Sequence, residues 1–161
     1  MGVIRRALGV AAAVACVVPA ACHSTPPGPE QAATQFVQAL NAKDVSAMMS
    51  LAATPFHFRR QEWANASAGS GLVRGTTTER VAPTPFELGR LLQDVAKVKI
   101  ATATAEANPP SKADLLRDVL KDAPGVWGDL NLMMFRQDAN DPHLAIVGVD
   151  AAGKIQAVYV S

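Results

Sequence analysis

The stretch from Pro29 to Phe58 most constrains the fold, because two helical patterns run directly into a strand pattern there. Pro29 suits the first position of a helix, since its missing N–H would be unpaired there and its φ is already helical. Apolar residues then recur at helical spacing, at Ala33, Phe36, Val37 and Leu40. The pattern predicts an amphipathic helix that begins at Pro29 and ends near Asn41 to Lys43.

A second, shorter helix and a strand are predicted next. Asp44 is a favourable N-cap, and Met48, Leu51 and Ala52 would form the buried face of this helix. The helix should stop at Thr54, because the residue before a proline avoids helical geometry. The run Phe56-His57-Phe58-Arg59 alternates apolar and polar residues, which is typical of a half-buried strand.

Residues 1–22 are interpreted as an export signal. Arg5 and Arg6 precede the apolar run Ala7 to Val18, which is shorter than the about 20 residues of a membrane-spanning helix. Pro19-Ala20-Ala21-Cys22 resembles the bacterial lipobox, in which the cysteine is lipidated, although Pro19 stands where leucine is usual. The alternative is ordinary cleavage after Ala20, which would leave Cys22 as a lone thiol in an exported protein. We expect a lipoprotein signal with Cys22 as the lipidation site.

The rest of the chain is interpreted as a tether and one domain. Residues 23–28, His-Ser-Thr-Pro-Pro-Gly, predict a flexible spacer, and residues 29–161 are long enough for one domain with a core. Removal of Arg5 and Arg6 with the signal leaves 13 of the 15 basic residues, against 14 acidic residues. A near-neutral domain lacks the basic patch that nucleic acid requires, so we expect no nucleic-acid partner.

The middle of the chain predicts alternating helices and strands. Gln61 to Gly75 is polar and glycine-rich, which indicates a loop or loose hairpin, and Thr76 to Val81 predicts a short strand. Thr84 and Glu87 form a capping box for a third helix. Val98 to Glu106 alternates in character and predicts another strand.

The C-terminal third predicts one helix followed by a meander. Ser111 to Asp114 is a capping signal for a fourth helix that ends before Pro124. Strands are predicted at Val126 to Phe135, His143 to Val149 and Lys154 to Val160, with turns at Asp138 to Pro142 and Asp150 to Gly153. Gly153 ends the second turn, where a positive φ is expected.

The N-terminal stretch resembles the opening of the NTF2-like superfamily, also called SnoaL-like or ketosteroid-isomerase-like. The resemblance is carried by Phe36-Val37-x-Ala39-Leu40-Asn41-Ala42-Lys43-Asp44, by Met48 and Leu51, and by Pro55-Phe56-His57-Phe58. It implies an α+β fold in which N-terminal helices pack on a curved antiparallel sheet that forms a cone, with any active site inside the cone. The helix predicted after Ser111 departs from this pattern and would be an insertion at one end of the cone.

No catalytic residue is assigned from the sequence. The resemblance implies that an enzyme of this family would use an Asp or His base with Tyr or acid donors. His57, Arg59, Trp63, Asp129, Arg136, His143 and Tyr159 offer such groups, but not at a recognisable catalytic spacing. If Phe56 and Phe58 pack under the helices, His57 points away from the core. Trp63, Arg136, His143 and Tyr159 are the candidates for lining a ligand pocket.

The sequence also predicts no metal site and no cofactor. The three histidines are scattered, whereas zinc needs three or four convergent ligands. Asp138-x-Asn140-Asp141 lacks the closing glutamate of a calcium loop. GxSxG, HExxH and phosphate-binding glycine motifs are absent from the sequence.

We therefore expect a non-enzymatic lipoprotein of the bacterial cell envelope, held at a membrane by its lipid anchor. Its domain would bind a small apolar ligand or a protein partner, and a homodimer is one such partnership. The alternative function is a small cofactor-independent lyase or isomerase that uses the cone cavity. A third hypothesis is an interaction protein that uses the outer sheet face. The alternative location is a soluble secreted or periplasmic form.

Overall fold

The computed structural model describes residues 27–65, 71–100, 110–123, 125–136 and 143–161. The predicted signal peptide, the lipidation site Cys22 and residues 23–26 of the predicted tether lie outside these ranges, as does the turn predicted at 138–142. In the described ranges, every helix is too short or too polar to cross a membrane.

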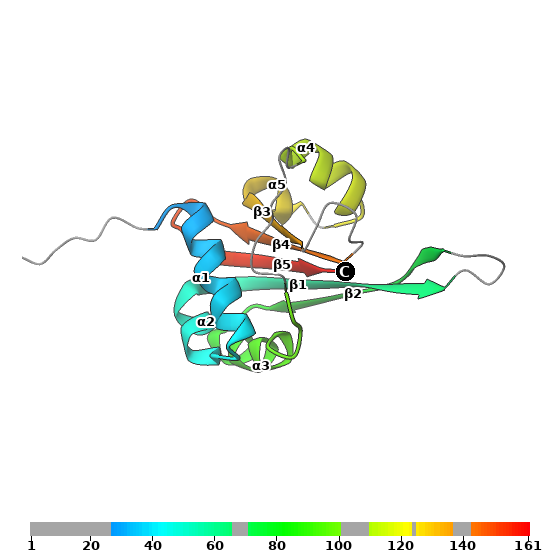
Figure 1. Cartoon of the computed structure of the whole chain (residues 1–161). Coiled ribbons are helices and arrows are strands. Elements are labelled where there is room, and N and C mark those ends of the chain that lie inside the picture. Colours follow the sequence, from blue (N-terminus) through cyan, green and yellow to red (C-terminus); the bar gives the residue numbers. More distant parts are fainter. Residues whose placement is uncertain (1–26, 66–70, 101–109, 124, 137–142) are drawn as a thin grey trace, which may run out of the picture.

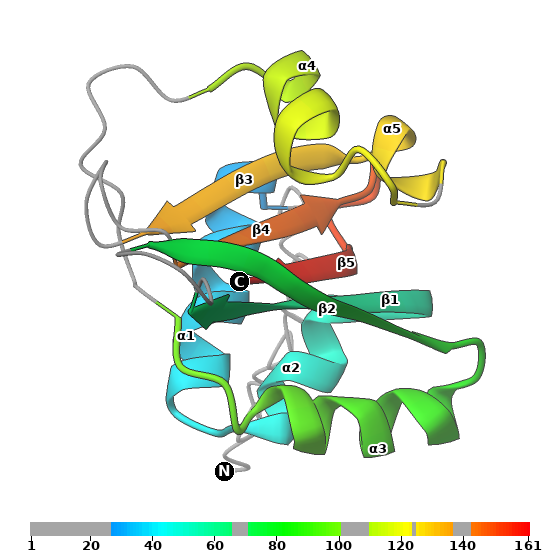
Figure 2. The same cartoon turned by 90° about the vertical axis from the view of Figure 1, so that its right-hand side faces the viewer.

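A five-stranded sheet carries helices on both of its faces (Figures 1 and 2). Its strands are β1 (Ala52–Asn65), β2 (Leu72–Ala82), β3 (Asn131–Arg136), β4 (Leu144–Val149) and β5 (Ile155–Val160). The strand order is β2-β1-β5-β4-β3, so the sheet is open with β2 and β3 at its edges. The predicted α+β class is confirmed.

The predicted antiparallel sheet contains one parallel pair. The pairs β1–β2, β3–β4 and β4–β5 are antiparallel, but β1 and β5 run parallel. Hairpins fix the directions of β2 relative to β1 and of β5 relative to β4. When the two hairpin units join through β1 and β5, their relative direction is set by packing and not by a short turn.

Helices α1 (Pro29–Asn41), α2 (Val45–Leu51) and α3 (Pro85–Val95) cover one face of the sheet (Figure 1). They bury the inner cluster, which includes Phe36, Leu40, Met48, Phe56, Phe58, Leu92, Val95, Val147, Val158 and Val160. The predicted helical stripe is confirmed, and Asp44 caps α2 by accepting from the N–H of Ala47 at 2.9 Å. Thr84 caps α3 by accepting from the N–H of Glu87 at 3.3 Å.

The boundary between α2 and β1 differs from the prediction. The sequence predicts Ala52 on the buried face of the helix, yet this residue begins β1. It pairs with Ile155 of β5, so the sheet ladder begins three residues before Pro55. Phe56 and Phe58 face the helices, which confirms the predicted alternation in this strand.

The opposite face is covered by α4 (Lys112–Asp114), the π-helical turn η1 (Leu115–Val119) and α5 (Val126–Asp129). These elements bury the outer cluster, which consists of Leu115, Leu120, Trp127, Leu130, Ile146, Ala157 and Tyr159. The predicted cap is confirmed, because the hydroxyl of Ser111 accepts from the N–H of Asp114 at 3.2 Å.

The strand predicted at Val126 to Phe135 is wrong in its first half. Val126–Asp129 form α5, and β3 begins at Asn131. A helical turn brings Trp127 and Leu130, three positions apart, onto the same side, where both are buried against the sheet. An extended chain would have sent these two side chains to opposite faces.

The hairpin of β1 and β2 has longer strands than the sequence predicts. Gln61 to Gly75 predicts a loop or loose hairpin, and the structure forms a hairpin in which β1 continues to Asn65 and β2 begins at Leu72. A register shift between Gln61 and Trp63 marks a bulge. The Gln61 side chain spans it, donating to the carbonyl of Gly75 at 3.0 Å and accepting from the hydroxyl of Thr77 at 2.6 Å. Figure 1 shows this hairpin projecting beyond the rest of the sheet.

The strand predicted at Val98 to Glu106 is not formed at Val98–Ile100, and its residues 101–106 lie outside the described ranges. The side chain of Asn41 holds this segment instead. Its amide donates to the carbonyl of Ile100 at 2.8 Å and its oxygen accepts from the N–H of Ile100 at 3.1 Å. At the other end of the chain, β4 and β5 confirm the predicted hairpin, and Gly153 has the expected positive φ of 77°.

Candidate functional site

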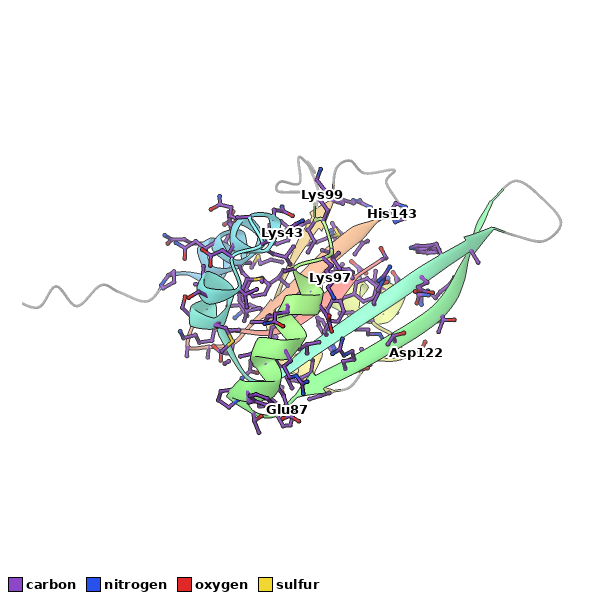
Figure 3. All side chains as sticks on the ribbon, turned by 90° about the horizontal axis from the view of Figure 1, so that it is seen from below. Lys43, Glu87, Lys97, Lys99, Asp122 and His143 are labelled. Atoms are coloured by element: carbon purple, nitrogen blue, oxygen red, sulfur yellow. The ribbon has the colours of Figure 1, made fainter. Side chains whose placement is uncertain are left out.

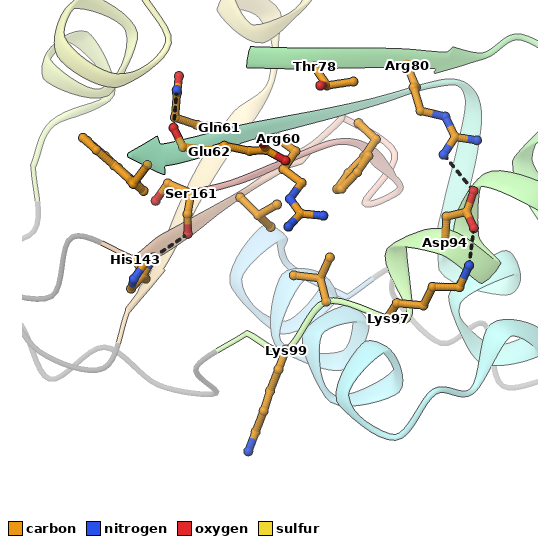
Figure 4. Close-up of a pocket in the computed structure, with 14 residues that line it drawn as sticks. Arg60, Gln61, Glu62, Thr78, Arg80, Asp94, Lys97, Lys99, His143 and Ser161 are labelled. Carbon is orange, nitrogen blue, oxygen red and sulfur yellow. Dashed lines mark hydrogen bonds and ion pairs between the residues drawn. The ribbon is translucent and has the colours of Figure 1, made fainter. Parts of the chain in front are cut away.

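A groove of about 790 Å³ opens at the margin of the inner cluster. It lies between β1, β2, the C-terminal end of α3 with the residues after it, and the end of β5 (Figure 4). Its lining residues are Phe58, Arg60, Gln61, Glu62, Trp63, Thr78, Arg80, Asp94, Lys97, Val98, Lys99, His143, Val160 and Ser161.

The floor of the groove is apolar. Phe58 and Val160 belong to the inner cluster, with 7% and 6% of their surfaces exposed, so the groove is where that cluster reaches solvent. Val98, just after α3, packs against the same cluster. Trp63 is half-buried in the wall, and its Nε1 is covered without a hydrogen-bond acceptor in the described part of the chain.

A shared ion pair closes one side of the groove. Asp94 of α3 accepts from Arg80 of β2 and from Lys97, each at 2.7 Å (Figure 4). The hydrogen bond from Lys97, followed by the one from Arg80, lowers the pKa of Asp94 from 3.8 to about 2. Asp94 is therefore ionised at neutral pH and links the edge strand β2 to the end of α3.

Two further cations line the groove without such a partner. The side chains of Arg60 and Lys99 make neither a hydrogen bond nor an ion pair with any residue that the structure describes. In Figure 4 the guanidinium of Arg60 points into the groove, whereas Lys99 extends away from it. In Figure 3, Glu87 lies at the end of α3 that is opposite to Lys97.

The structure brings together two of the four predicted pocket residues. Trp63 and His143 both line the groove, and Nδ1 of His143 lies 3.2 Å from the carbonyl oxygen of Ser161. Tyr159 lies on the opposite face in the outer cluster, where burial raises the pKa of its phenol. Arg136 follows Phe135 on β3, and strand alternation directs it away from the inner cluster that Phe135 joins. Arg136 and Tyr159 therefore do not share a site with Trp63.

The sequence does not single out Arg60, Arg80, Asp94 or Lys97 as site residues. Arg60 stands two positions after Phe58, so strand alternation places it on the same face, and this signal was available in the sequence. The meeting of Arg80 with Asp94 was not foreseeable, because it depends on the long pairing of β2 with β1.

A second cluster of polar side chains lies on the face of the hairpin opposite Phe56 and Phe58. Glu79 accepts from Nη1 of Arg59 at 3.1 Å, and its other oxygen lies 3.7 Å from Nδ1 of His57. Arg59, 7% exposed, also donates to the carbonyl of Asp122 at 3.0 Å. His57 is thus on the face opposite Phe56 and Phe58. These contacts tie β1 to β2 and to the turn that follows η1, a structural role that accounts for the buried charge of Arg59.

Comparisons with known proteins and the metal-site geometry add no assignment. Among the described residues, histidine, cysteine and carboxylate side chains do not gather into a group of three or more that could hold a metal ion. The chain matches no protein-family model, and no curated protein is similar to it in sequence.

Proposed function

We propose that this chain is a non-enzymatic binding protein that holds a small molecule with an apolar body in the groove. The observation that carries the proposal is the apolar floor of Phe58, Val98 and Val160 beneath a ring of polar side chains. Small-molecule sites typically have volumes of about 300–1,000 Å³ and combine an apolar lining with a few polar groups. The groove volume of about 790 Å³ falls in this range.

The ion pairs of Asp94 argue against this residue as a catalytic base. A catalytic base works best when its pKa lies near the working pH. The pKa of Asp94 is lowered to about 2, and its oxygens accept from Arg80 and Lys97. A carboxylate in this state is a weak proton acceptor, and its role in the groove is to position the two cations.

The proposal includes a fold relationship and a location. The order of helix, helix and strand over Pro29–Phe58 supports membership of the NTF2-like superfamily. In this proposal the ligand site is the groove beside β1, β2 and the end of β5. The lipobox-like sequence ending at Cys22 supports export and a lipid anchor. Metabolic labelling with a radioactive fatty acid tests the anchor: the full chain should be labelled and the Cys22→Ser variant should not. Equal labelling of both proteins would remove the anchor from the proposal.

Binding is tested with N-phenylnaphthylamine, a neutral apolar probe whose fluorescence rises in apolar surroundings. The chain has two tryptophans, so the Trp127→Phe variant leaves Trp63 in the groove as the single indole donor. We expect saturable binding at one site, with energy transfer from Trp63 to the probe. Absence of saturable binding would refute the proposed function.

A matched pair of variants locates the probe. Val98 lines the groove, whereas Val126 packs against the outer cluster, and both are half-buried. Val98→Glu should weaken binding of the probe because it places a carboxylate on the apolar floor. Val126→Glu should leave the affinity unchanged. Equal loss in both variants would show that the probe reports general loosening of the fold rather than a bound state in the groove.

A further inference from the structure

We infer that the ligand of the groove is an amphipathic anion whose acidic group is bound by the guanidinium of Arg60. The inference rests on the proposed function, because it names the chemical class of molecule that the same groove would bind. It follows from the charge of the lining, from the position of Arg60 and from the apolar surface beside it.

The lining of the groove has more positive than negative side chains. Arg60, Arg80, Lys97 and Lys99 are cationic, and Glu62 and Asp94 are the two carboxylates. Asp94 accepts from both Arg80 and Lys97, so one carboxylate serves two cations. Arg60 and Lys99 add charge that no described residue compensates in a direct contact. The excess favours an anion over a neutral or cationic ligand.

Arg60 differs from the arginines that have structural partners. Arg59, Arg80 and Arg117 each pair with a carboxylate at 3.1 Å or less. Arg60 has no such partner in the described ranges, and its guanidinium points into the groove (Figure 4). A guanidinium presents two parallel N–H donors, which match the paired oxygens of a carboxylate, phosphate or sulfonate.

The surroundings of Arg60 require that the anion also has an apolar part. Arg60 pairs with Val160 across the β1–β5 register, and Phe58 precedes it on the same face of β1. An acidic group on Arg60 would therefore have its body over Phe58, Val98 and Val160. A small inorganic anion would leave this floor exposed to water, so a molecule with one acidic group and an apolar body fits better.

Two probes with the same aromatic body separate binding in the groove from recognition of an anion by Arg60. Anilinonaphthalene sulfonate carries an acidic group that N-phenylnaphthylamine lacks. We expect the full-length protein to bind the sulfonate more tightly than the neutral probe, by about fivefold to tenfold for one charge-assisted contact in a partly open site. Added salt should weaken binding of the sulfonate and leave binding of the neutral probe unchanged.

The role of Arg60 is tested with the Arg60→Gln variant. The control is Arg90, an exposed arginine of α3 that lies over the Phe86 ring outside the groove. Arg60→Gln should remove the preference for the sulfonate and leave the affinity for the neutral probe unchanged. Arg90→Gln should change neither affinity. Arg60→Lys should recover part of the preference, because it restores charge without the paired donors. Thermal unfolding of each variant verifies that it is folded.

The outcomes distinguish the two proposals. If neither probe binds, the proposed function fails and this inference fails with it. If both probes bind with equal affinity, or if Arg60→Gln weakens both equally, the groove remains a binding site and the assignment of an anion to Arg60 is overturned. Selective loss of the sulfonate in Arg60→Gln but not in Arg90→Gln is the result that supports the inference.

Discussion

Gly148 of β4 lies where the outer cluster packs closely against the sheet. A Cβ at this position would stand 2.6 Å from Cδ1 of Leu130, 3.3 Å from Cβ of Ala157 and 3.4 Å from Cβ of Leu130. Optimal carbon–carbon contacts are about 3.5–4.0 Å. Leu130 is 2% exposed, so its side chain has little space in which to move. We therefore predict that Gly148→Ala destabilises the fold.

The size of the effect follows from two opposing terms. Overpacking of a filled core typically costs about 1–3 kcal/mol, and replacing a strand glycine with alanine gains about 0.5–1 kcal/mol of backbone entropy. For Gly148→Ala we expect a net loss of about 1–2 kcal/mol in the free energy of unfolding. Leu130→Ala removes the closest contact, at its own cost of about 2–5 kcal/mol. In that background the Gly148→Ala change should be neutral or stabilising.

The assay is urea unfolding followed by circular dichroism for the wild-type protein, both single variants and the double variant. Gly128 of α5 is the control, because a Cβ there meets no atom within 4 Å. Gly128→Ala should not be destabilising. If Gly148→Ala costs the same in the wild-type protein and in the Leu130→Ala variant, the contact is not the cause and the described packing of the outer layer is wrong.

Three further predictions concern titratable groups. Glu79→Gln should lower the free energy of unfolding by about 1–3 kcal/mol, because it leaves the buried Arg59 without its carboxylate partner. Chemical denaturation should show recovery in Arg59→Met/Glu79→Gln, and no recovery would argue against the ion pair. The pKa of Asp94 is lowered, so its stabilising contribution should be present above its unfolded value of 3.8 and lost as the pH falls toward about 2. The free energies of unfolding of wild type and Asp94→Asn should therefore converge at low pH, and a constant difference would contradict the ion pair. Tyr159 is the one tyrosine of the chain, and burial raises its pKa, so ultraviolet titration should place its midpoint above 10.0. Stability should fall as the pH rises from the unfolded-state pKa of Tyr159 to its raised folded-state pKa, and an ordinary midpoint would show the phenol to be exposed.

Local signals in the sequence were sufficient for the helical part of the fold. Pro29, Asp44, Thr84 and Ser111 begin or cap helices because each acts on neighbouring backbone groups. Gly153 could be placed in its turn for the same reason. These interactions span a few residues, so no knowledge of the distant chain was needed to predict them.

The errors occurred where distant contacts decide the structure. The length of the hairpin strands could not be predicted from the polar, glycine-containing run after Gln61, because these strands are stabilised by pairing across the bulge. The parallel pairing of β1 with β5 depends on residues about one hundred positions apart, such as His57 and Ala157. The candidate site reflects the same limit, since Arg80 meets Asp94 only after the hairpin and α3 are both in place.

The most direct test of the account is a map of amide chemical shifts by NMR during titration with anilinonaphthalene sulfonate. The account predicts that the largest changes cluster at residues 58–63, at 97–99 and at Val160, and that Arg60→Gln reduces them selectively. Changes centred instead on the outer cluster around Trp127 and Leu130, or no saturable change at any residue, would contradict the assignment of this groove as the binding site.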